Sequence, residues 1–132
     1  MSEVLVKGNL LIFDKRDVNN NIFPKKCNIT LPEMVPVYID DIYTLIGFIT
    51  SYNVSDSKIE IRAKIHYIEE HLLKKVIADG NVYIAGCYRV NASHTEDGAT
   101  IIDDLELLSA FITLNDVYGG SNDLKLEVIN ND

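Results

Sequence analysis

The segment that decides the fold is Asn81–Asn115, NVYIAGCYRVNASHTEDGATIIDDLELLSAFITLN. It contains two apolar runs rich in β-branched and aromatic residues, which favour strands. The polar residues Ser93–Gly98 lie between these runs and predict a turn. Asp103 and Asp104 interrupt the second run and predict a bend between two strand segments. The segment therefore predicts paired strands around which the rest of the chain is organised.

The rest of the chain supplies further strands at the spacing of a compact all-β domain. Thr44–Val54 and Lys58–Ile65 flank a tight polar turn, and the second run alternates apolar and charged residues, so we expect a hairpin with one solvated face. Polar residues 14–23 predict a loop. The remaining predicted strands are 3–13, with a bulge or close backbone approach at Gly8, then 25–31, 35–40 and 124–129.

In one stretch the apolar residues recur with the period of a helix and not with that of a strand. In His66–Gly80 the apolar residues recur at helical spacing, and Gly80 predicts the end of a helix. The predicted fold class is therefore mainly β (α+β): a β-barrel of about seven or eight strands with one helix. We expect a single domain over residues 1–132, with a frayed tail at 130–132. A barrel is favoured because an open sheet of many strands leaves unpaired edges.

Composition excludes several classes of function. At 132 residues and 47% hydrophobic residues, the chain can form one core and is too apolar for wholesale disorder. Its net charge of −8 repels phosphate backbones, so we expect no nucleic-acid partner. No apolar run has the length of a membrane span and no secretory leader is visible, so we expect no membrane partner.

Residue types that often carry chemistry are present without a recognisable catalytic pattern. His66, His71 and His94 lack the spacing of a metal site and are predicted to lie on the surface. Cys27 and Cys87 are predicted to be buried free thiols, because both lie in apolar, strand-like surroundings. No serine lies in a GxSxG elbow, and no glycine-rich phosphate loop is present. We therefore expect no metal site and no cofactor.

The order of the elements resembles that of the prohead maturation proteases of tailed phages, a family similar in fold to the herpesvirus capsid-maturation protease. The shared motifs are Val35-Pro36 and Ile46-Gly47 at the ends of the family's histidine segment, the strand AGCYRV after the predicted helix, and the acidic strand with Glu106-Leu107. The resemblance covers residues 35–115. It implies a β-barrel with peripheral helices and, in active members, a catalytic serine and histidine.

Carried onto this chain, the catalytic positions of the family are degenerate. Ala85 stands at the nucleophile position, the histidine position falls near Asp40 or Asp41, and the downstream serine position falls near Phe111. Alanine has no nucleophilic atom, and a carboxylate is a poor substitute for imidazole at neutral pH. Cys87 could share the face of Ala85, but without a nearby base its thiol stays mostly protonated. We therefore expect a protein that is not an enzyme.

The resemblance implies that the protein belongs to a phage head, where the ancestral enzyme already contacted the major capsid protein. We expect an auxiliary or decoration protein of the virion capsid, assembled in the host cytoplasm, whose partners are the major capsid protein and other virion proteins. The acidic surface suits binding to protein better than binding to packaged DNA. Two alternatives stay open: an active prohead protease with an atypical nucleophile, and a small barrel that serves as a binding module outside any virus.

Overall fold

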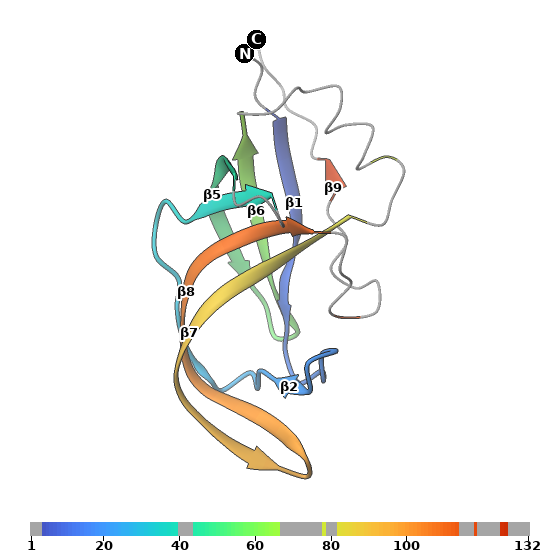
Figure 1. The fold of residues 1–132 in the computed structure, drawn as a ribbon, viewed down its shortest axis with the longest axis vertical. Helices are drawn as coiled ribbons and strands as arrows, with labels where there is room; N and C mark the ends of the chain where they lie inside the picture. The colour runs from blue at the N-terminus through green and yellow to red at the C-terminus, as the bar shows by residue number, and fades with distance from the viewer. Residues whose placement is uncertain are drawn as a thin grey trace.

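The computed structural model describes residues 4–39, 44–66 and 82–113, together with residues 78, 118, 125 and 126. Most of the predicted helix, and the positions Asp40 and Asp41, therefore lie outside the described residues. The described chain is built of strands (Figure 1). These are β1 (Val4–Ile12), β2 (Asn21–Ile22), β3 (Asn28–Thr30), β4 (Pro36–Ile39), β5 (Thr44–Val54), β6 (Lys58–Ile65), β7 (Tyr83–Glu96), β8 (Ala99–Thr113) and β9 (Lys125–Leu126).

Strand β8 organises the sheet. Along one edge it pairs antiparallel with β7, and along the other it pairs parallel with β2, β3 and β4 in turn. From β4 the sheet continues through antiparallel β5, β6 and β1 to β9. Strand twist curls this sheet into a half-barrel around its core (Figure 1).

The predicted mainly-β domain is thereby confirmed, and two strand predictions have the observed boundaries. Strands β5 and β6 begin and end where the sequence pattern places them. Among the described residues the sheet has nine strands, and the additional ones are very short: β2 has two residues and lies inside the stretch predicted as a loop. Its pairing with β8 is a long-range contact that no local pattern in residues 14–23 indicates.

The β7–β8 hairpin has a shorter turn than the sequence predicts. Strand β7 continues to Glu96, so the prediction of a turn over Ser93–Gly98 is wrong for its first four residues. Asp97 and Gly98 form the turn, with φ angles of 51° and 79°. Positive φ at both positions is the conformation of a type I′ turn, whose twist matches that of the flanking strands.

Strand β8 runs without a break through Asp103 and Asp104, so the predicted division into two segments is also wrong. The local irregularity is a β-bulge, because Asp103 has no partner between the pairs Ala92↔Asp104 and Ser93↔Ile102. The inserted residue leaves Ile102 and Leu105 both buried although they are three positions apart. The bulge therefore preserves the apolar face of the strand while increasing its twist.

Two glycines within the strands have different roles. Gly8, predicted to mark a bulge or close approach, pairs regularly with Ile61, and the bulge of β1 lies at Leu10, where the register shifts. Gly47 marks a close approach: a Cβ there would lie 2.0 Å from the backbone oxygen of Lys64. Strands β5 and β6 can pair at this spacing only because residue 47 has no side chain.

Candidate functional site

A row of apolar side chains crosses the convex face of the sheet. Leu45 pairs with Tyr38, Tyr38 pairs with Phe111, and Phe111 pairs with Ala85, so the row spans β5, β4, β8 and β7. We call these four residues the outer row. Their sequence neighbours lie in the core and are at most 1% exposed: Val37, Ile46, Ile84 and Ala110. Because side chains alternate between the two faces of a sheet, the outer row faces away from this core.

The structure thus brings together two of the degenerate catalytic positions, Ala85 and Phe111, as direct partners across β7 and β8. The centroid of the Phe111 ring lies 6.1 Å from that of Tyr38, with the planes inclined by 38°. Asp40 and Asp41 lie outside the described residues. The outer row holds no Ser, Cys, His or charged side chain, and its one polar side-chain group is the Tyr38 hydroxyl. What it offers is a mainly apolar surface with an aromatic centre.

Cys87 lies two residues beyond Ala85 and faces solvent, so the prediction that both cysteines are buried is wrong for Cys87. It pairs with Ser109 across the hairpin, and none of the described residues forms a hydrogen bond or ion pair with its thiol. His94 lies seven residues further along the same extended strand, about 20 Å away. His94 therefore cannot act as a base for Cys87 while β7 keeps this conformation.

Cys27 is the second free thiol and is partly buried. Burial raises its pKa to about 11, and the nearby carboxylates of Asp103 and Asp104 add to the effect. This thiol is protonated at neutral pH and is a poor nucleophile. The prediction of unpaired thiols is confirmed for both cysteines.

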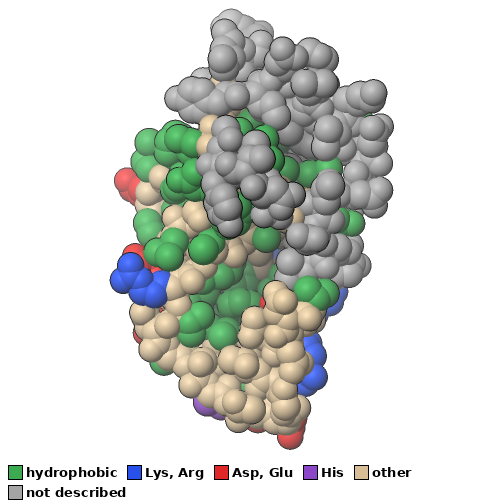
Figure 2. All heavy atoms as spheres, in the orientation of Figure 1, with side chains coloured by type: hydrophobic (Ala, Val, Ile, Leu, Met, Phe, Trp, Pro, Cys, Tyr) green, Lys and Arg blue, Asp and Glu red, His purple; other side chains and the backbone are tan. Residues whose placement is uncertain are grey.

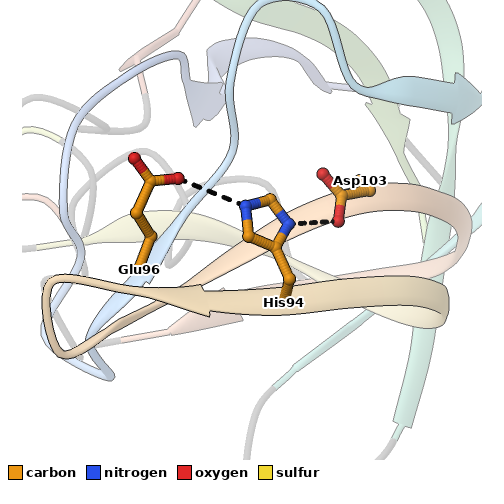
Figure 3. Close-up of polar contacts among 3 residues, drawn as sticks. All are labelled: His94, Glu96 and Asp103. Atoms are coloured by element: carbon orange, nitrogen blue, oxygen red, sulfur yellow. Dashed lines mark hydrogen bonds and ion pairs between the residues drawn. The ribbon is translucent and has the colours of Figure 1, made fainter.

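His94 lies on the surface, as predicted, but within a strand and between two carboxylates (Figure 3). Its Nδ1 lies 2.6 Å from a carboxylate oxygen of Asp103, and its Nε2 lies 3.3 Å from one of Glu96. These contacts raise the pKa of His94, with the Asp103 hydrogen bond as the larger cause. The Asp97-Gly98 dipeptide is a two-residue turn signal, and the register that it implies could have placed His94 near Asp103 from sequence alone.

A pocket of about 220 Å³ lies where the half-barrel stays open. Strands β1 and β7 approach each other there, but the described residues show no backbone pairing between them. Leu10 of β1 lines the pocket on one side, and Ala85 and Gly86 of β7 line it on the other. Figure 2 shows a hollow in this face of the molecule, bordered by hydrophobic side chains and by polar or backbone atoms. We call this site the seam pocket.

Polar groups from three distant segments converge on the seam pocket: Asp17, Tyr88 and Tyr118. Asp17 is only 9% exposed, and its Oδ1 accepts hydrogen bonds from the backbone N–H groups of Asn19 and Asn21, each 2.9 Å long. The Tyr88 hydroxyl is buried and has no hydrogen-bond partner.

Burial is the main cause that raises the pKa of both tyrosines well above the usual value. The second cause for Tyr88 is Tyr118, and for Tyr118 it is Asp17, so these groups lie close enough to interact electrostatically. The sequence indicates none of this, because the three residues belong to different segments.

Two further observations concern the described residues only. They contain no group of three or more His, Cys, Asp or Glu side chains placed to hold a metal ion. No helix among them is long and apolar enough to cross a membrane.

Comparisons with known proteins found no matching family model, no matching protein and no matching solved structure. The resemblance to prohead proteases, and the lack of activity expected from it, therefore stay predictions.

Proposed function

We propose that this protein is a non-catalytic structural component of a tailed-phage head and that it docks onto the major capsid protein through the outer row. The observation that carries the proposal is the replacement of reactive groups by an apolar surface. Where the resemblance expects a nucleophile and a second serine, the paired residues are Ala85 and Phe111. The resemblance supplies the phage context of the proposal.

The outer row has the chemistry of the centre of a protein interface. Such centres are enriched in aromatic residues and depleted of charge, and a few buried aromatic side chains carry most of the binding energy. The rings of Tyr38 and Phe111 are in tilted contact at the middle of the row, and Leu45, which is 37% exposed, extends it across β5. The surrounding surface of a chain with a net charge of −8 favours a partner with a basic rim.

Docking through the sheet face is better supported than docking through the free edge of β7. An edge accepts a further strand readily when it is flat and uncharged. The outer part of β7 instead carries the charged residues Arg89 and Glu96 and an unpaired bulge residue, Asn91. These features protect the edge and leave the face as the docking surface.

Phe111→Glu tests this proposal by placing a charge in the outer row. The matched control is Val54→Glu, which places the same charge at a 49% exposed apolar residue at the end of β5. Each protein is incubated with shells assembled from the major capsid protein and sedimented. We expect the wild type and Val54→Glu to co-sediment, and Phe111→Glu to stay in the supernatant with a wild-type circular dichroism spectrum.

Equal co-sedimentation of both variants would argue against the outer row as the docking surface. Quantification of the protein in purified particles tests the wider claim, since a structural component is present in a fixed, stoichiometric copy number. Cleavage of the capsid protein that is lost in Cys87→Ala would instead support the alternative, an active protease with an atypical nucleophile.

A further inference from the structure

We propose that the seam pocket binds a small organic ammonium ion, with Asp17 as its counter-ion. The role differs from docking through the outer row, because it uses the opening between β1 and β7, and the two sites share only Ala85. Three properties of the pocket support it: a carboxylate oxygen that is accessible from the pocket, aromatic walls, and a volume larger than ordered water requires.

Asp17 contributes a carboxylate to the pocket, and its Oδ2 is not a buried atom, so it stays accessible from the pocket. A carboxylate in a partly enclosed site favours a cation as its partner. Two backbone N–H groups satisfy Oδ1, but Oδ2 has no partner among the described residues, and none of their Lys, Arg or His side chains forms an ion pair with Asp17. Lys15, two residues away, donates instead to the backbone oxygen of Tyr118 at 2.7 Å. The pocket therefore offers Asp17 Oδ2 as an acceptor for the N–H groups of a bound cation.

Aromatic rings form the walls around this carboxyl group. The ring centroids of Phe23 and Tyr88 lie 5.6 Å apart with the planes inclined by 48°, and the buried Tyr118 also lines the pocket. Ring faces attract organic cations, most strongly where water is excluded. The unpartnered Tyr88 hydroxyl supplies an oxygen that can accept an N–H donor after a small adjustment of the side chain.

The position of Tyr88 depends on Gly86. A Cβ at Gly86 would lie 2.4 Å from Cζ and 2.5 Å from the hydroxyl oxygen of Tyr88. The absence of a side chain at residue 86 thus lets the Tyr88 ring fold back against its own strand and form a wall of the pocket.

The volume points to a compact ligand. A pocket of about 220 Å³ has room for about seven water molecules, which is more than two unsatisfied groups need. It is smaller than the usual site for a drug-sized molecule. A short alkylammonium ion is larger than a few water molecules and smaller than a drug-sized ligand. Its N–H groups can donate to Asp17 Oδ2, and its alkyl part can contact Leu10 and Phe23.

The test compares a cation with its neutral counterpart of the same shape. The full chain, labelled with ¹⁵N, is titrated with 3-methylbutylammonium and separately with 3-methylbutan-1-ol, and amide shifts are followed by NMR. We expect saturable shifts at Asn19, Asn21 and Gly86 with the ammonium ion, and at least tenfold weaker binding of the alcohol. Loss of one charge-assisted contact is large enough for this ratio.

Asp17→Asn tests the carboxylate itself. Asparagine keeps a carbonyl oxygen that can accept from the N–H groups of Asn19 and Asn21, so the loop is retained while the charge is removed. We expect at least tenfold weaker ammonium binding in Asp17→Asn and unchanged binding in Asp56→Asn, an exposed carboxylate in the β5–β6 turn.

Three results would each overturn the proposal: no saturable shifts with the ammonium ion, equal affinity for the alcohol, or full affinity in Asp17→Asn. Equal affinity for the alcohol would show a merely apolar cavity. If Asp17→Asn fails to fold, the comparison of the ammonium ion with the alcohol on the wild-type protein still tests the proposal. Phe111→Glu should bind the ammonium ion like the wild type, which separates this site from the docking surface.

Discussion

Gly47 leaves no space for a side chain, and its replacement by alanine should therefore cause a large loss of stability. The new Cβ would lie 2.0 Å from the backbone oxygen of Lys64, 2.9 Å from its carbonyl carbon and 3.0 Å from Cα of Ile65. All three atoms belong to the backbone of β6, so no side-chain rotation can relieve the contact. Strand β6 cannot move away either, because it pairs with β1 on its other edge.

The size of the effect follows from the cost of overpacking. Inserting a methyl group into a well-packed region typically costs about 1–3 kcal/mol, and a clash with paired backbone lies at the upper end or beyond. We expect Gly47→Ala to lower the free energy of unfolding by about 3 kcal/mol or more, which corresponds to a fall in Tm of about 10 °C for a domain of this size. Urea denaturation followed by circular dichroism measures the first quantity, and a thermal melt measures the second.

Gly98→Ala is the matched control, because it makes the same chemical change for a different structural reason. A Cβ at Gly98 meets no atom within 4 Å, but its φ of 79° is unfavourable for alanine. The expected loss is about 1 kcal/mol, the usual cost of a non-glycine residue in the left-handed region. If Gly47→Ala proved no more destabilising than Gly98→Ala, the described spacing of β5 and β6 would be refuted.

Three further predictions concern titratable side chains. His94 has a raised pKa, so its stabilising effect is fully present below its unfolded pKa of about 6.5 and is lost as pH rises through the folded value. Asp103→Asn should lower the pKa of His94 in an NMR titration, and an unchanged pKa would contradict the described hydrogen bond. Iodoacetamide at pH 8 should alkylate the exposed Cys87 well before Cys27, whose pKa is raised to about 11; equal rates by mass spectrometry would argue against burial of Cys27. Tyr88→Phe removes a buried hydroxyl without a partner, so stability in urea should stay unchanged or rise by up to about 1 kcal/mol, and a clear loss would reveal a partner for that hydroxyl.

Gly47 also bears on the resemblance to prohead proteases. Ile46-Gly47 is one of the motifs that carry this resemblance, and in the structure both residues have a packing reason. Ile46 is 1% exposed in the core, and Gly47 permits the close approach of β6. Packing therefore accounts for both residues, so the motif by itself does not require an ancestral active site.

Local sequence patterns determined the mainly-β class and the limits of its most regular strands. In Lys58–Ile65 the apolar and charged residues alternate with the period of a strand, and β6 has these bounds. Thr44–Val54 carries β-branched and aromatic residues between polar breaks, and β5 has these bounds. These predictions succeed because they depend only on neighbouring residues, whose side chains face the core and the solvent in alternation along a strand.

Only the tertiary structure decided what β8 pairs with and which residues meet. The parallel pairing of β8 with β2, β3 and β4 joins residues far apart in the chain, and its register brings Tyr38, Phe111 and Ala85 into one row. The seam pocket likewise unites Asp17 with Tyr88. Strand alternation specifies which face a residue occupies but not its cross-strand partner, because many registers preserve the same alternation. The candidate docking row and the candidate ligand site therefore arise from long-range register, which no single stretch of this sequence encodes.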